Sequence, residues 1–191
     1  FGFQYAGRLE GGSPTEGLTT RKVSSAYGVG LFQGDPVLSM STGYIQAATS
    51  NTVTVAGIFN GTEYLNSNVG RKVWFNSLPA SGLGADGLAY LSNDPQALWV
   101  AQSTGSSAVA FSDIGANIGF ATGSGNTTTG RSTYVLDQGT IGTTNTLPFR
   151  IVGLWSQYAT APGTQGTDDT SPFNWVVVSL NNTDRTSTTG V

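Results

Sequence analysis

The residues best suited to acid–base chemistry are the eleven aspartates and glutamates, because the chain has no histidine and no cysteine. Two carboxylates that face one pocket can hydrolyse a glycosidic bond, and such a pair would join Glu63 to Asp86 or Asp94. Asp86 precedes a glycine and Asp94 precedes a proline, and aspartates at such positions usually cap turns. The pattern favours turns over catalysis, so we expect no enzyme and no catalytic residue.

Other catalytic and cofactor sites lack their usual residues. A serine nucleophile would need Lys22 or Lys72 as its base, and neither belongs to a recognisable S-x-x-K element. The pair Asp168 and Asp169 lacks the spacing of a calcium loop. Without histidine or cysteine, the common zinc and thiol centres are excluded. The sequence therefore predicts no metal site and no bound cofactor.

Charge and hydropathy exclude two classes of partner. Only 10% of the residues are charged, the net charge is -3, and the eight lysines and arginines form no basic stripe. Direct binding of nucleic acid is not expected, because neutralisation of phosphates dominates that affinity. No apolar run reaches the length of a membrane-spanning helix, so we expect no membrane partner. A neutral surface rich in Ser, Thr and Asn suits binding or assembly.

Short apolar runs and alternating patterns, with almost no helical period, predict many strands. Gly34-Asp35-Pro36, Asn60-Gly61 and Asn93-Asp94-Pro95 are expected turns between them. Trp74, Trp99, Trp155 and Trp175 lie in apolar runs, which indicates core packing. The expected strands lie near Val37–Met40, Tyr44–Ala48, Val53–Phe59, Lys72–Phe75, Leu88–Leu91, Leu98–Gln102, Ser132–Leu136, Phe149–Trp155 and Trp175–Leu180.

The predicted fold class is mainly β, with small β-barrel or jelly-roll-like domains, an extended N-terminal arm and long loops. Residues 1–22 suit either a first strand with a loop or an arm that docks on a neighbour, and we predict the arm. Two β subregions follow, at 23–102 and 103–180. Residues 181–191 hold almost no apolar side chain and are expected to form a flexible tail.

Several short motifs follow one another between Phe1 and about Leu180. They are Phe1-Gly2-Phe3, Leu31-Phe32-x-Gly34-Asp35-Pro36-Val37, Gly43-Tyr44-Ile45, Val55-Ala56-Gly57-Ile58-Phe59-Asn60-Gly61, Trp99-Val100-Ala101-Gln102, Asp113-Ile114-Gly115-Ala116-Asn117, Thr129-Gly130-Arg131-Ser132 and Leu147-Pro148-Phe149-Arg150-Ile151-Val152-Gly153-Leu154. In order and spacing they resemble the capsid decoration, or cement, proteins of tailed bacteriophages. The resemblance covers most of the chain, although each motif alone is weakly specific.

The resemblance implies a non-enzymatic virion protein that binds the outside of an assembled shell of major capsid protein and stabilises it. It also implies association with neighbouring copies as dimers or trimers, and a place on the outer capsid surface after synthesis in the bacterial cytoplasm. We predict Phe1, Phe3, Tyr5 and Arg8 as capsid anchors, because aromatic and arginine side chains commonly anchor protein interfaces.

Two other classes stay open at this point. One is a phage tail or head-fibre module or a surface adhesin, which would share the β-rich, neutral composition. The other is a carbohydrate-binding β-domain that uses exposed tyrosines with Asn or Asp, although the sequence indicates no particular cluster.

Overall fold

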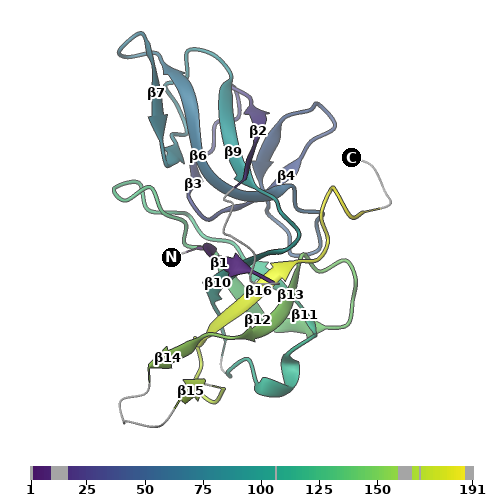
Figure 1. Ribbon diagram of the computed structural model, residues 1–191. Coiled ribbons are helices and arrows are strands. Elements are labelled where there is room, and N and C mark those ends of the chain that lie inside the picture. The colour runs from purple at the N-terminus through teal and green to yellow at the C-terminus, as the bar shows by residue number, and fades with distance from the viewer. Residues whose placement is uncertain (1, 10–16, 106, 159–164, 168, 188–191) are drawn as a thin grey trace.

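The computed structural model of the protein describes residues 2–9, 17–105, 107–158, 165–167 and 169–187. Its main strands form two six-stranded antiparallel sheets, which lie one above the other in Figure 1. Over the described residues the only helix is a single 3-10 turn, η1 (Phe111–Asp113), and none is long and apolar enough to cross a membrane. The prediction of a mainly β fold is confirmed.

The first sheet, in the upper half of Figure 1, is built around the long central strand β6. Its strand order is β2 (Leu18–Val23), β9 (Gly87–Ser92), β6 (Gly57–Asn66), β4 (Pro36–Ser39) and β5 (Ile45–Ala47), with β7 (Arg71–Phe75) paired to β6. A short ladder joins β3 (Leu31–Phe32) to β8 (Ser77–Leu78). Alternate residues of β9 are buried, as expected for a strand with one face on a core.

The second sheet, in the lower half, contains most of the C-terminal chain. Its strand order is β1 (Gln4–Arg8), β10 (Ala97–Gln102), β16 (Trp175–Leu180), β13 (Phe149–Leu154), β11 (Asn117–Ala121) and β12 (Val135–Gly142). A hairpin of β14 (Ser156–Tyr158) and β15 (Gln165–Thr167) extends from it. The core of this half includes Trp99 and an aromatic group in which Phe149 contacts Phe3 and Phe120.

Neither sheet closes on itself through the described strands. The first sheet ends at β2 and β5, and the second ends at β1 and β12. The structure is therefore a pair of open antiparallel sheets, each with its own cluster of buried side chains. The cluster of buried residues that belongs to the second sheet also includes Ala48, Val55 and Ile58 from the first half. The two halves therefore share part of one core.

The N-terminal segment is a component of both sheets and not a free arm over the described residues. β1 pairs with β10 in the second sheet, and β2 pairs with β9 in the first. The physical reason is that Phe3 leaves only 3% of its surface exposed and stacks on Phe149, with ring centroids 4.4 Å apart. Composition could not reveal these pairings, because the paired residues lie 64 to 96 positions further along the chain.

The passage between the sheets falls earlier than expected. β9 belongs to the first sheet and β10 to the second, so the change occurs at residues 93–96 and not after Gln102. The short Asn93-Asp94-Pro95 link resembles a hairpin turn in sequence. In the structure this link carries the chain from one sheet to the other, and β10 packs with β1 and β16.

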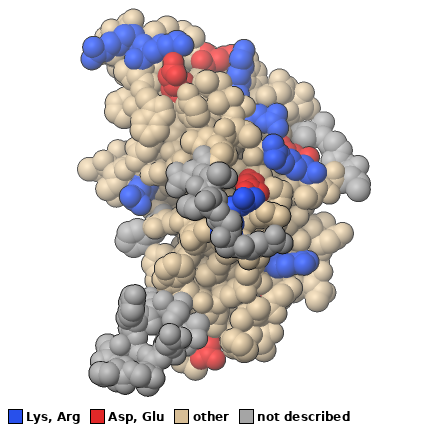
Figure 2. All heavy atoms as spheres, viewed as in Figure 1, with Lys and Arg blue, Asp and Glu red and all other residues tan. Residues whose placement is uncertain are grey.

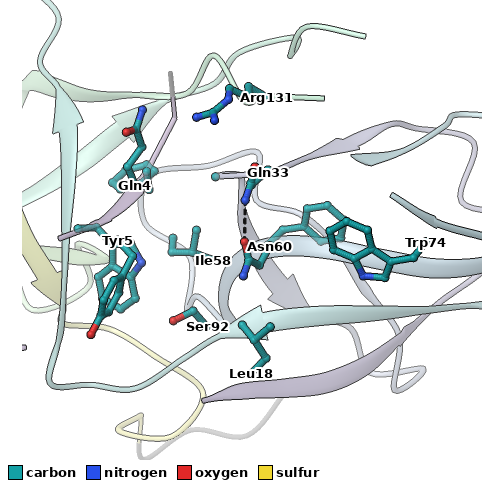
Figure 3. A pocket seen from close by; sticks show the side chains of 13 residues that line it. Gln4, Tyr5, Leu18, Gln33, Ile58, Asn60, Trp74, Ser92 and Arg131 are labelled. Carbon is teal, nitrogen blue, oxygen red and sulfur yellow. Dashed lines mark hydrogen bonds between the residues drawn. The ribbon is translucent and has the colours of Figure 1, made fainter. Parts of the chain in front are cut away.

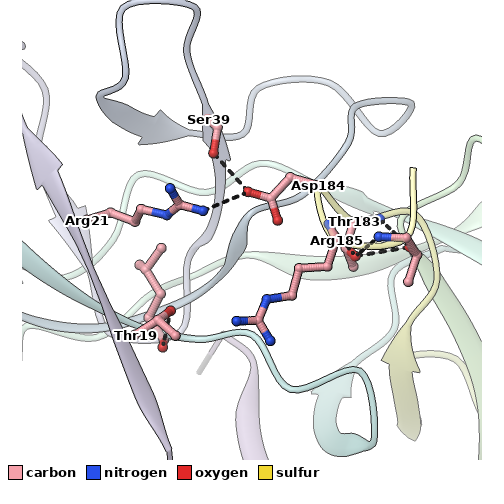
Figure 4. Close-up of polar contacts among 8 residues, drawn as sticks. Thr19, Arg21, Ser39, Thr183, Asp184 and Arg185 are labelled. Carbon is pink, nitrogen blue, oxygen red and sulfur yellow. Dashed lines mark hydrogen bonds and ion pairs between the residues drawn. The ribbon is translucent and has the colours of Figure 1, made fainter. Parts of the chain in front are cut away.

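Residues 181–187, expected to be a flexible tail, cross back to the first sheet (Figure 4). The Val55 N–H donates to Asn182 O at 3.0 Å, and the Asp184 N–H donates to Val55 O at 3.2 Å. Asp184 Oδ2 accepts from Ser39 Oγ at 3.0 Å and pairs with Arg21 at 3.4 Å. Polar side chains and backbone thus hold this segment, and such contacts leave no hydrophobic pattern in the sequence.

Candidate functional site

The predicted capsid anchors are mostly engaged inside the protein. Phe3 is in the core, and Tyr5 is half-buried against it. Arg8 pairs with Asp94 at 3.2 Å and donates to Gln96 Oε1 at 2.8 Å. Phe1 lies outside the described residues. The Phe3 ring is not exposed to a partner, and the other described anchors already have partners or packing within the fold.

The carboxylates considered for acid–base chemistry have separate partners. Glu63 pairs with Lys72 at 3.1 Å, and Asp94 pairs with Arg8. Asp86 accepts from Ser25 and from the Tyr44 hydroxyl, and these hydrogen bonds lower the pKa of Asp86, the backbone N–H of Ser25 most strongly. No group of three or more acidic side chains that could hold a metal ion occurs among the described residues. Figure 2 shows scattered charges on a largely uncharged face.

Asp35 is the most perturbed carboxyl and lies where the two halves meet. Only 2% of its surface is exposed, and burial raises its pKa from 3.8 to about 6. The Phe32 N–H donates to Asp35 Oδ2 at 2.8 Å, which closes the turn that precedes β4. In the same turn, Gly34 accepts from the Phe3 N–H at 3.1 Å. Asp35 therefore closes a turn at the junction, and it also lines a second cavity of about 810 Å³ together with Tyr27 and Tyr134.

A cavity of about 390 Å³ opens between the two sheets, and we call it the junction hollow (Figure 3). Its wall combines aromatic rings, amides and one cation, and the described lining residues include no carboxylate. Residues of both sheets, and Arg131 from the loop before Ser132, line this hollow. The lining residues on which its chemistry depends are Gln4, Tyr5, Gln33, Asn60, Trp74 and Arg131.

Two irregularities of β6 shape this hollow. The register against β9 shifts between Phe59 and Gly61, so Asn60 is the extra residue of a β-bulge, and bulges commonly redirect a side chain. A Cβ atom on Gly61 would lie 2.7 Å from Cζ2 of Trp74. Glycine therefore lets the indole lie against the strand, while 59% of the Trp74 surface stays exposed.

A pair of amides forms the centre of the hollow. Gln33 Nε2 donates to Asn60 Oδ1 at 2.8 Å, and this hydrogen bond fixes the orientation of both side-chain amide groups. Gln33 Oε1 and Asn60 Nδ2 make no further hydrogen bond within the described structure. Figure 3 shows the pair between Trp74 on one side and Tyr5 on the other. The centre thus presents one acceptor and one donor side by side, because amides carry both functions.

Arg131 is held at the rim of the hollow by backbone contacts. The Gln33 N–H donates to Gly130 O at 2.9 Å, and the Ser132 N–H donates to Gln33 O at 2.9 Å. The preceding loop is closed by Asn126, whose Oδ1 accepts from the N–H groups of Thr128 and Thr129. No ion pair to the Arg131 guanidinium exists within the described part of the chain. The loop 123–130 that precedes Arg131 is mostly exposed, and from this part of the chain only Arg131 lines the hollow.

A second group of exposed apolar side chains belongs to the second sheet. They lie on η1, on the turn before β16 and after the end of β13, and we call Phe111, Ile114, Trp155 and Phe173 the distal apolar group. Phe111 is 67% exposed and Phe173 is 56% exposed. Figure 1 shows η1 and the start of β16 at the end of this sheet farthest from the first.

Phe173 also has an unusual backbone. Its φ is 62°, and it is the only non-glycine residue with positive φ in the described chain. Buried Asn174 fixes the turn, since its Oδ1 accepts from Ser103 Oγ at 2.8 Å and its Nδ2 donates to Val109 O at 2.9 Å. Positive φ is unfavourable for a bulky residue, and such strain gathers at functional positions.

Sequence reasoning missed the main elements of both sites. Trp74 and Trp155 were expected in the core, and both are exposed. Asn60-Gly61 was expected to form a turn, and instead it is a bulge inside β6. The sequence does contain one signal, an Asn-Gly pair within an otherwise apolar strand pattern, which is typical of a bulge as well as of a turn.

Comparison with protein-family models, with curated proteins and with solved structures gives no match for this chain.

Proposed function

We propose that this protein is a non-enzymatic structural protein of a tailed-phage virion, which binds the outside of the assembled capsid shell and stabilises it. The observation that carries the proposal is the distal apolar group on a body with few charges. Large exposed apolar side chains that gather at one end of a protein commonly mark a protein interface. The motif resemblance gives the partner, the major capsid protein.

The strained backbone of Phe173 supports a docking role for the distal apolar group. A phenylalanine that is both exposed and held at positive φ contributes little to folding. A ring in this conformation is accounted for if it inserts into a partner. Phe111 and Trp155 would act beside it, since buried aromatic anchors dominate interface energetics. The proposed contact therefore uses Phe111 and Phe173 in place of the predicted anchors, and Trp155 lies beside one of those anchors, since it lines a pocket together with Gln4 and Tyr5.

A shell offers the same site many times, so the affinity of each copy need not be high. Association between neighbouring copies, as dimers or trimers, would increase retention through effective concentration. The low charge of the surface reduces repulsion between crowded copies. The proposal assigns no catalytic activity and no cofactor to the protein.

The test is cosedimentation with undecorated shells of the source phage, with bound copies counted per shell. We expect saturation at a fixed ratio to the major capsid protein and loss of binding in a Phe111→Ser/Trp155→Ser double variant. Trp74→Ala, which removes an exposed aromatic outside the distal apolar group, is the matched control and should bind normally. Recovery of the protein in tails, with no binding to intact shells, would refute the proposal and favour a fibre module.

A further inference from the structure

The junction hollow has the features of a ligand site that shell binding does not require. Its wall holds an open indole face, an oriented amide pair and a cation without a described ion-pair partner. From this combination we propose that the hollow binds a saccharide that carries a carboxylate, such as a short uronic-acid oligosaccharide. This inference is independent of capsid binding, because the two sites use different residues.

The aromatic element of the site is prearranged. One side of the Trp74 indole lies against Gly61, and the ring remains largely exposed on a strand of the first sheet. The flat face of a pyranose presents C–H groups that carry partial positive charge, and the face of an aromatic ring is negative. Trp74 therefore offers a stacking surface whose conformation is set before a ligand arrives, which reduces the entropy lost on binding.

The amide pair matches the chemistry of a sugar. A vicinal diol can donate one hydrogen bond and accept another from adjacent atoms, and the free atoms Gln33 Oε1 and Asn60 Nδ2 offer the complementary acceptor and donor. An apolar ligand would bury these amide atoms without partners, at a cost in affinity. The pair therefore selects a hydroxylated ligand over a purely hydrophobic one.

Arg131 defines the charge of the ligand. Among the described residues it is the only charged one in the wall of the hollow. A guanidinium binds a carboxylate through two parallel hydrogen bonds, so an acidic sugar fits better than a neutral one. One cation is too few for a nucleic acid strand, whose binding depends on several phosphate contacts.

The test is isothermal titration of the full chain with trigalacturonic acid and with galactotriose, its neutral counterpart. We expect the acidic trisaccharide to bind more tightly. Trp74→Ala should weaken its binding about tenfold or more, as expected for loss of an aromatic contact. Phe111→Ala is the control, since it removes an exposed aromatic ring that does not line the hollow, and it should leave binding unchanged.

Arg131→Gln separates charge recognition from stacking. The substitution should lower the affinity for the acidic trisaccharide about tenfold and leave the affinity for the neutral trisaccharide unchanged. The proposal is overturned if trigalacturonic acid gives no binding heat, if Trp74→Ala binds like the unaltered protein, or if a triaspartate peptide binds as tightly as the sugar. Equal affinity for both trisaccharides would remove the assigned role of Arg131 and the acidic class of ligand.

Discussion

The junction between the sheets and the distal end of the second sheet use aromatic residues in opposite ways. At the junction Phe3 is stacked on Phe149, and the exposed Trp74 borders amides and a cation. At the distal end Phe111 and Phe173 are exposed on short turns. Exposure of an aromatic ring therefore does not by itself identify a function, and the polar groups beside the ring separate a small-ligand site from a docking surface.

Phe3→Ala gives the largest expected effect and tests whether the N-terminal segment belongs to the junction. Removal of a buried ring that packs on Phe149 should lower the free energy of unfolding by about 3–5 kcal/mol. Urea denaturation followed by tryptophan fluorescence measures it. An unchanged free energy of unfolding would mean that Phe3 is not a core residue in solution and would return it to the role of an external anchor.

Asp35→Asn tests the buried carboxyl at the junction through the pH dependence of stability. The pKa of Asp35 is raised by burial to about 6, so the folded state holds its proton more tightly than the unfolded state. The contribution of this group to the free energy of unfolding is fully present below about pH 4. As the pH rises through about 6, the free energy of unfolding should fall by about 2–3 kcal/mol.

The variant should lack this loss and should be more stable than the unaltered protein at pH 7.5. Urea denaturation of both proteins from pH 4 to pH 8 gives the comparison. Parallel curves for the two proteins would show that Asp35 titrates normally and that the junction does not bury its charge.

Phe173→Gly tests the distal end, where we expect stability and binding to change in opposite directions. Glycine adopts the φ of 62° without strain, so the variant should gain about 0.5–1 kcal/mol of stability. Its affinity for undecorated shells should fall because the exposed ring is lost. Thermal unfolding and cosedimentation measure the two effects, and a stabilised variant with full shell binding would remove Phe173 from the interface.

Asp184→Asn gives the smallest expected effect, since it weakens one contact of the C-terminal segment with the first sheet. Arg21 is partly exposed, so solvent screens the pair and the loss should be about 0.5–1 kcal/mol. Thermal unfolding measures it, with Arg185→Gln as the control because Arg185 makes no ion pair within the described chain. Equal effects of the two substitutions would mean that the bond to Arg21 contributes nothing specific.

Local sequence patterns were sufficient for much of the strand content. The run Trp175–Leu180 becomes β16 with the predicted bounds, and Lys72–Phe75 falls within β7. These segments are rich in β-branched and aromatic residues, whose preference for strands is local. The pattern failed for β1 and β2, because a short strand with mixed exposure is recognised only through its partner.

The sequence by itself determined the absence of histidine and cysteine chemistry, the low charge and the mainly β class, since these follow from composition and local propensity. Tertiary structure decided which residues meet. It buried Phe3, exposed Trp74 over Gly61, brought Gln33 to Asn60 and placed Arg131 at the rim beside them. Each of these contacts depends on register, bulges and pairing between segments distant in the chain, and such long-range geometry leaves almost no trace in a single sequence.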